Sequence, residues 1–187
     1  GYLAAIRVAF SMGVNVVGAD RLSVIHKTAI IMPLPISYKE RIAAVPGVTA
    51  VTHLNWFGGI YQDPKNFFPQ MAVDTDTMFN LYNELVVPAD QMAAWKADQT
   101  GAMVGKATMD RFGWKLGQRI PIQGTIFRKQ DGSPLWEFTI RGVYTGREDN
   151  ILWRNADGGS EAHGARALFK GDAVALPPDV IHSVTNP

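Results

Sequence analysis

The chain has 187 residues, of which 47% are hydrophobic and 19% charged, as is usual for a globular protein with room for one domain or two small ones. Its 18 basic and 17 acidic residues give a net charge of +1 without any basic run, so nothing indicates a nucleic-acid partner. The absence of cysteine excludes disulfides, thiolate metal sites and cysteine nucleophiles, and it leaves the redox compartment open.

An apolar helical pattern occupies residues 1 to about 17. Its uncharged run, residues 8–19, is well short of the roughly 20 residues that cross a bilayer. The basic flank of a signal peptide is also absent. This start fits an extracytoplasmic domain cut just after a membrane helix, and it equally fits a core helix or the remnant of a tag.

A strand over residues 21–31, a short helix and a second strand are predicted next. Ser37 and Glu40 have the spacing of a capping box at the start of the helix, and Pro46-Gly47 ends it. Three residues form an apolar stripe along it: Tyr38, Ile42 and Val45. We therefore expect the helix to lie over a sheet, with a right-handed crossover placing the two strands parallel or nearly neighbouring.

The second of these strands shows an alternating pattern. The residues expected to share one of its faces are Val48, Ala50, Thr52, Leu54 and Trp56. Gly58-Gly59 predicts a bend after it, and Asp63-Pro64 a turn. The dense aromatic residues between positions 57 and 68 are more typical of a packed sheet corner than of a ligand-stacking surface.

The middle of the chain alternates between strands and helices. A third strand is predicted at residues 70–74, followed by a helix capped by Asp74 or Thr75 that carries Met78, Leu81 and Tyr82. Residues 88–97 form a further predicted helix.

A short buried strand is predicted at residues 101–105, leading into a helix over 106–112 that Gly113 ends. The junction resembles a phosphate loop only superficially, because the required lysine-hydroxyl ending and glycine spacing are absent. A meander of short strands follows from residue 114, with strands at 125–129 and 136–144 and a turn at Asp131-Gly132.

No catalytic constellation is evident, so we predict that the chain is not an enzyme. The four histidines are widely spaced and form no metal motif: His26, His53, His163 and His182. No Gly-x-Ser-x-Gly nucleophile elbow occurs. The carboxylates are scattered and are read as caps and solvated positions: Asp63, Asp74, Asp76, Glu84 and Asp90.

Residues 1 to about 144 resemble the periplasmic core domain of MacB/FtsX-like ABC transporter permeases. The segments that carry the resemblance are Ala19-Asp20-Arg21-Leu22, Val45-Pro46-Gly47-Val48, Asn55-Trp56-Phe57-Gly58-Gly59-Ile60-Tyr61, Phe67-Phe68, Ala72-Val73-Asp74, residues 105–117 and residues 138–144. The resemblance implies a non-enzymatic domain at the periplasmic face of the inner membrane, which binds a partner or substrate and relays conformational change. Its implied partners are the remainder of the permease and its ATPase, with another periplasmic component or a second copy of the chain as additional candidates.

The tail departs from this pattern, because residues 143 to 187 resemble a fragment of a cysteine dioxygenase-like cupin. In such cupins the histidine matching His182 is the third ligand of an iron ion, behind a His-x-His pair that this sequence lacks. We therefore expect no cofactor and no metal site, with His182 as a weak candidate ligand and iron as the cofactor only under this alternative. The alternative function is thus a fragment or fusion related to a thiol dioxygenase, or a chimera without evolved function.

The fold class expected from these patterns is α+β. Three segments are predicted: an incomplete porter-like βαβ lobe over 1–86, a small, mostly β lobe over 87–144, and a cupin-like β segment over 145–187. The strands that complete the porter-like sheet are not evident, and the tail or another chain is expected to supply them.

Overall fold

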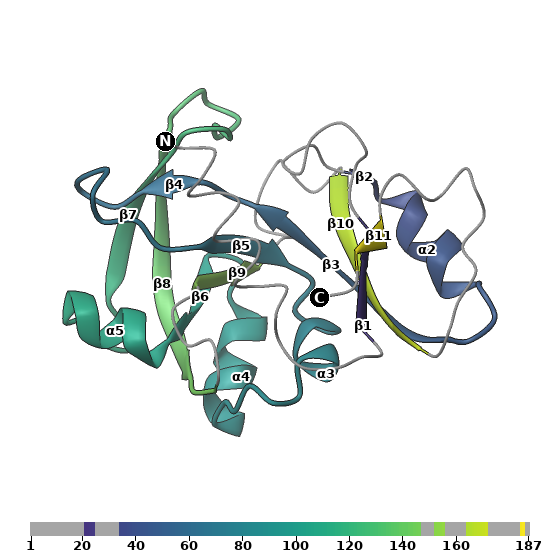
Figure 1. Ribbon diagram of the computed structural model, residues 1–187. Helices are drawn as coiled ribbons and strands as arrows, with labels where there is room; N and C mark the ends of the chain where they lie inside the picture. Colours follow the sequence, from purple (N-terminus) through teal and green to yellow (C-terminus); the bar gives the residue numbers. More distant parts are fainter. Residues whose placement is uncertain (1–20, 25–33, 147–151, 156–163, 172–183, 186–187) are drawn as a thin grey trace.

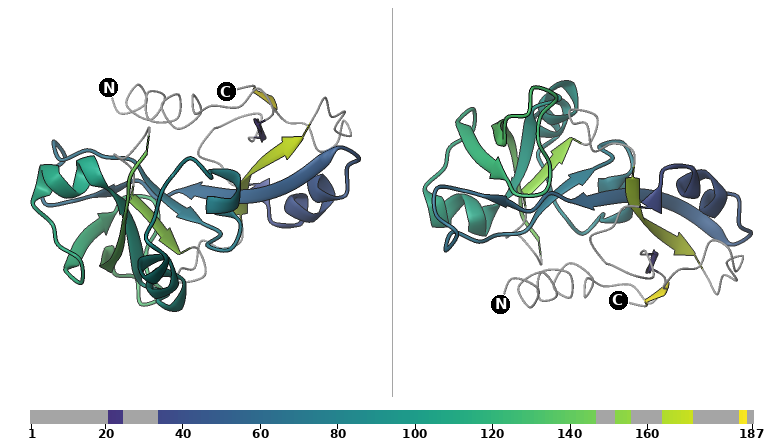
Figure 2. Two further views of the ribbon diagram at one scale, coloured as in Figure 1. Left: turned by 90° about the horizontal axis from the view of Figure 1, so that it is seen from below. Right: turned by 90° about the horizontal axis from the view of Figure 1, so that it is seen from above.

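A computed structural model describes residues 21–24, 34–146, 152–155, 164–171 and 184–185 (Figure 1). The helix predicted over residues 1–17 and most of the first predicted strand lie outside these ranges. Figure 2 shows two lobes side by side, with the long strand β3 extending from one into the other.

The elements alternate along the chain. In order they are β1 (Arg21–Val24), β2 (Leu34–Pro35), α2 (Ser37–Ala43), β3 (Val48–Trp56), β4 (Gly59–Ile60), β5 (Gln70–Val73), α3 (Met78–Leu81), α4 (Ala89–Ala97), β6 (Gly101–Gly105), α5 (Lys106–Phe112), β7 (Arg119–Gly124), β8 (Leu135–Tyr144), β9 (Leu152–Asn155), β10 (Gly164–Gly171) and β11 (Val184–Thr185). Neighbouring strands follow the order β11-β1-β10-β3-β5-β9-β6-β8-β7-β4, and β2 pairs with β10.

The first lobe is a split βαβ unit. Strand β10 lies between β1 and β3 and is antiparallel to both, so β1 and β3 are parallel to each other and one strand apart. This confirms the predicted near-neighbour arrangement. Helix α2 packs on this sheet through Ile42, which is fully buried with Val24, Leu34 and Val51. The sheet expected to be incomplete within residues 1–86 thus receives its central strand from residues 164–171.

The start of α2 differs from the prediction. The helix begins at Ser37, and Ile36 is the residue that flanks it, without a side-chain capping bond. Because Ser37 already lies inside the helix, its hydroxyl is not in the N-cap position, and the predicted capping box is wrong. The predicted apolar stripe is confirmed, since Tyr38 and Val45 pack beside the buried cluster.

An irregularity in the pairing of β3 changes which residues share a face. Lys170 pairs with Ala50, whereas the next residue of β10 pairs with Val48, so one residue of β3 is skipped. Val48 consequently packs in the cluster under α2, while Leu54 and Trp56 belong to the next cluster. The prediction that Val48 shares their face is therefore wrong.

The sheet of the second lobe closes on itself. Pairing passes from β3 through β5, β9, β6, β8 and β7 to β4, and β4 follows β3 along the chain after only Phe57 and Gly58. Gly58 has a φ of +63°, a conformation that glycine adopts without the steric cost of a Cβ, so the predicted bend is confirmed.

The interior of this closed sheet is rich in aromatic side chains. Phe57 is 1% exposed and lies edge-on to Trp136 and Phe138, with ring centroids 5.5 and 5.6 Å apart. Tyr61, Phe68 and Trp114 are buried in the same cluster. The aromatic residues after β3 therefore pack a core, as the structural interpretation predicted.

Most of the elements predicted after β4 are present, including β5, α4, β6 and α5 with its left-handed end at Gly113. The predicted strand at residues 125–129 is wrong, because these residues lie in the connection between β7 and β8. The turn at Asp131-Gly132 is confirmed: the Gly132 N–H donates to the Lys129 carbonyl at 2.9 Å, and Gly132 has a φ of +84°.

Strands from residues 145–187 pair with both earlier segments. Strand β9 lies between β5 and β6, β10 lies between β1 and β3, and β11 pairs with β1. The division of the chain into three segments stays a prediction, and the hydrogen-bonded strand order runs across all of them.

Replacing the central aromatic side chain of the second lobe provides a test of this core. Phe57→Ala should lower the free energy of unfolding by about 3–5 kcal/mol, because it leaves a cavity between three aromatic rings. Phe67→Ala is the matched control, since Phe67 is 37% exposed and should cost roughly 1 kcal/mol or less. Urea unfolding measures both changes, and equal losses would contradict the assigned core.

Candidate functional site

A polar cluster joins the two lobes where β3 passes between them. The Lys39 ammonium on α2 donates to the carboxylate of Asp74, which follows β5. His53 of β3 lies beside them, with its Nδ1 atom 3.9 Å from Asp74 Oδ2. The side chains are mostly shielded: Lys39 is 29%, Asp74 16% and His53 14% exposed. We call Lys39, His53 and Asp74 the junction cluster.

A second contact strengthens the same junction. The Thr77 hydroxyl donates to the Thr52 hydroxyl at 2.8 Å, which joins the start of α3 to β3. Thr52 is fully buried, so this hydroxyl pair satisfies a polar group that could not otherwise reach water. The turn after β5 is thereby held against both α2 and β3.

The environment of Asp74 favours its charged form. Burial raises the pKa of this carboxyl, but the hydrogen bonds that it accepts from Lys39 and from the Asp76 backbone N–H act in the opposite direction. Together with the charge of Lys39 they hold the pKa of Asp74 below its ordinary value. The cluster is therefore an ion pair, and no substrate-facing acid or base is required to explain it.

The lowered pKa fixes the pH at which this contact weakens. A carboxyl with a lower pKa in the folded state contributes stability above its unfolded pKa, near 3.9, and that contribution disappears as the pH falls through the folded value. Asp74→Asn should cost roughly 1 kcal/mol at pH 7, and this cost should disappear in the acid range. Thermal unfolding between pH 2 and 7 measures it.

The control for this variant is Asp110→Asn, which removes an exposed ion pair four residues apart on α5. Exposed pairs contribute little, so the control should change stability by at most about 0.5 kcal/mol. A pH-independent cost of Asp74→Asn would show that packing, and not the ion pair, holds the junction.

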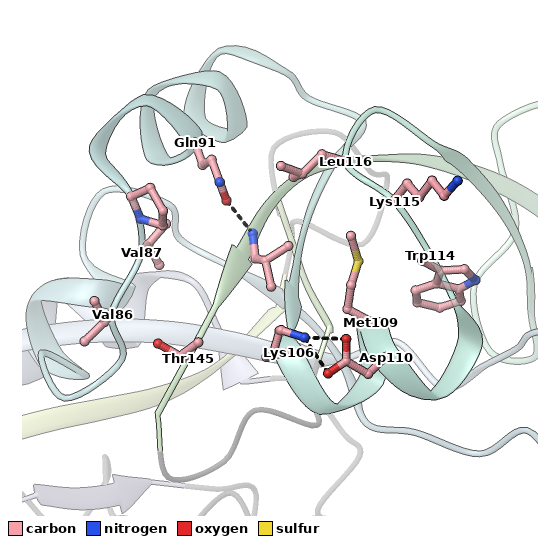
Figure 3. A pocket seen from close by; sticks show the side chains of 12 residues that line it. Val86, Val87, Gln91, Lys106, Met109, Asp110, Trp114, Lys115, Leu116 and Thr145 are labelled. Atoms are coloured by element: carbon pink, nitrogen blue, oxygen red, sulfur yellow. Dashed lines mark hydrogen bonds and ion pairs between the residues drawn. The ribbon is translucent and has the colours of Figure 1, made fainter.

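An apolar groove of about 710 Å³ opens on the second lobe between α4 and α5 (Figure 3). We call it the α4–α5 groove. Its lining comes from three separate parts of the chain: Val86, Val87, Pro88 and Gln91; Lys106, Met109, Asp110, Trp114, Lys115 and Leu116; Val143 and Thr145. Its volume and mainly apolar lining are typical of binding sites.

The end of strand β8 forms part of this groove. Thr145 exchanges two backbone hydrogen bonds with Val86, at 2.8 and 3.0 Å. The next hydrogen-bonded position in that register is Pro88, where the chain turns into α4: Pro88 has no N–H to donate, and its carbonyl accepts the Met92 N–H at 3.0 Å. The Val143 N–H donates instead to the side-chain carbonyl of Gln91 at 2.8 Å. A side chain thus takes the place of a neighbouring strand.

A polar groove of about 1000 Å³ lies between the end of α4 and strands β7 and β8. The Arg141 Nε donates to Asp98 at 2.7 Å, and Arg119 lines the same groove. Burial raises the pKa of Asp98, but Arg141 and Thr100 hold it below its ordinary value. The Arg141 side chain is 42% and the Asp98 side chain 20% exposed, and their ion pair ties β8 to the end of α4.

The residues weighed as metal ligands are mostly outside the described ranges. His26, His163 and His182 lie in undescribed segments, and only His53 of the four histidines is placed. Within the described part of the chain, no group of three histidine or acidic side chains is arranged to hold a metal ion. The weak iron assignment at His182 therefore stays a prediction.

Two of the carboxylates predicted to act as caps or solvated groups, Asp63 and Asp74, differ in their contacts. Asp63 accepts from the Lys65 N–H at 2.8 Å in the predicted turn. The prediction that Asp74 or Thr75 caps the next helix is wrong, because α3 begins at Met78 with Thr77 as its flanking residue and without a side-chain capping bond. The ion pair of Asp74 with Lys39 was missed because 35 residues separate the partners. Lys106, at the superficial phosphate loop, pairs with Asp110 on the same helix.

The sequence matches no protein-family model and no curated protein. The structure, in contrast, is similar to solved structures of transporter domains. A domain attributed to a permease protein from Porphyromonas gingivalis gives a TM-score of 0.54 at 12% identity, covering 86% of this chain and 79% of the other. The periplasmic region of MacB from Actinobacillus actinomycetemcomitans gives 0.53 at 11%, covering 85% and 78%.

The extracellular domain of the noncanonic ABC-type transporter YknZ from Gram-positive bacteria gives a TM-score of 0.55 at 9% identity, covering 82% of this chain and 83% of the other. The resemblance of the tail to a cupin is not shown by these structures. Among the residues that the structure places, no helix has the length and apolarity needed to cross a membrane. The chain has the α+β, porter-like fold of the periplasmic domains of MacB-type permeases.

Proposed function

We propose that this chain is a non-enzymatic extracytoplasmic domain of a MacB-type ABC transporter permease, which binds a partner or substrate outside the membrane and relays conformational change. The observation that carries the proposal is the likeness of more than four fifths of the chain to three transporter domains, two of them named as periplasmic or extracellular. The remainder of the permease and its ATPase are the partners of this function, with a periplasmic component as a further one.

The two-lobed architecture is suited to a relay. Strand β3 belongs to both lobes, so a displacement of one lobe is transmitted through a continuous hydrogen-bonded strand. The junction cluster adds a side-chain contact, because Lys39 moves with α2 while Asp74 moves with the end of β5. A change in the angle between the lobes must therefore break or rearrange this ion pair.

The membrane context is tested on the complete gene product from which this sequence derives. Its reading frame should encode an apolar span of about 20 residues adjoining this domain, and the protein should fractionate with the inner membrane. Protease added to the periplasmic side should cleave it, whereas protease on the cytoplasmic side should spare this domain. A reading frame without an adjoining span, or cleavage from the cytoplasmic side, would overturn the proposal.

The relay is tested by fixing the junction. The 187 residues contain no cysteine, so in a complete transporter whose other cysteines are replaced by serine, Lys39→Cys with Asp74→Cys creates one unique pair for a short bismaleimide crosslinker. In the complete transporter, crosslinking should reduce ATP-driven transport several-fold while the uncrosslinked double variant stays active. The two single-cysteine variants, treated in the same way, are the controls. Transport that is unchanged by complete crosslinking would show that this junction does not move.

A further inference from the structure

We propose that the α4–α5 groove is the docking site for an acidic, apolar peptide segment of a partner protein, in which an aliphatic or aromatic side chain lies next to an aspartate or glutamate. The inference rests on the proposed function, which calls for a partner outside the membrane, and deepens it by assigning that partner a surface and a chemistry. Three properties of the groove support it: exposed apolar side chains, an incomplete strand edge and an excess of positive charge.

The rim of the groove exposes large apolar side chains to water. Val86 is 63% and Leu116 50% exposed, and they are the two most exposed large hydrophobic residues within the described ranges. Beneath them lie Met109, 8% exposed, and Trp114, 4% exposed. Exposed apolar side chains at the rim of an apolar groove are typical of an interaction site, because a bound apolar segment removes their surface from water.

The incomplete strand edge favours a peptide over a lipid. The Val143 N–H at the groove is held by the Gln91 side chain, since the Pro88 carbonyl, which lies opposite it in the register begun by Val86, accepts the Met92 N–H of α4 instead. In Figure 3 the Gln91 side chain reaches this backbone position from α4. A peptide carbonyl can replace that of Gln91 as the acceptor of this one N–H, which is the main-chain contact that gives peptides affinity for the end of a strand. An acyl chain offers no such group along its length.

The charge around the groove selects an acidic segment. Lys106, Lys115 and Asp110 are the charged residues that line it. Asp110 pairs with Lys106 across one helical turn, as Figure 3 shows. Lys115 has no carboxylate partner within the described part of the chain. The groove therefore carries a net positive charge of one, which complements an acidic side chain at its rim and opposes a basic one.

The test is selection of random heptapeptides displayed on phage against the full 187-residue chain, with prior depletion on the Leu116→Asp variant. The enriched peptides should pair an aliphatic or aromatic residue with Asp or Glu. Synthetic copies should bind the wild-type chain and lose at least about fivefold in affinity on Leu116→Asp and on Lys115→Glu. Both substitutions lie on exposed side chains, and circular dichroism confirms that the variants fold.

Matched controls separate the groove from the general surface. Leu135→Asp changes an equally exposed leucine, and Lys65→Glu reverses an exposed lysine, and neither residue lines the groove. Both should leave peptide affinity within about twofold of the wild type. Peptides without acidic residues, or equal losses on the controls, would overturn the proposal. Because no transporter is present in this assay, its failure leaves the membrane topology test of the proposed function unaffected.

Decanoate and dodecanoate are assayed alongside by isothermal titration. Binding of these carboxylates that is lost on Leu116→Asp, without any enriched peptide, would assign the groove to an amphiphile and overturn the peptide proposal. Selection that yields no enriched peptide and no carboxylate binding would overturn it as well, since the groove would then recognise neither chemistry.

Discussion

The architecture depends on the hydrogen bonding of β3 along both of its edges. One edge pairs with β10 over most of the strand, and the other pairs with β5 near its end. A strand this buried cannot leave its backbone groups unpaired without a penalty for each of them. The chain therefore needs residues 164–171 beside β3 before the first lobe has a continuous sheet. The first lobe therefore depends on β10, a strand from near the end of the sequence.

This shared strand also determines where force can pass between the lobes. Helix α2 rests on β3 through Ile42 and Val51, and its Lys39 extends to the turn after β5. Within that turn, Thr77 is bonded to Thr52 of the same strand. Apolar packing fixes α2 to the first lobe, whereas the connection to the second lobe is polar and directional. Polar contacts of this kind can be exchanged at a smaller cost than a packed core can be opened, which suits the junction to a relay.

The sequence correctly predicted the elements whose ends require a backbone conformation that glycine favours. Gly113 and Gly58 adopt positive φ angles at a helix end and a bend, which is where glycine is favoured over other residues. The capping box failed because Ser37 lies one position inside the helix. The strand predicted at residues 125–129 failed because these residues lie in the connection between β7 and β8, where none of the described strands pairs with them.

The local sequence pattern did not predict the contacts between residues that are distant in the sequence. The pairing of β10 between β1 and β3 has no local signal, and its bulge places Val48 on a different face from the one alternation predicts. The ion pair of the junction cluster and the α4–α5 groove combine residues from segments that are distant in sequence. Exposure is equally non-local: Leu116 resembles any core leucine in the sequence, and only the fold leaves it half exposed.

The likeness to solved transporter domains supports the proposed class of protein, whereas the chemistry of the groove supports the proposed kind of partner. At 9–12% identity the likeness is one of fold. It does not preserve the side chains that select a partner, because a fold supports many sites. The apolar rim, the Gln91 amide and Lys115 belong to this sequence. The chemistry of the proposed partner therefore depends on the groove, whereas the proposed relay depends on β3.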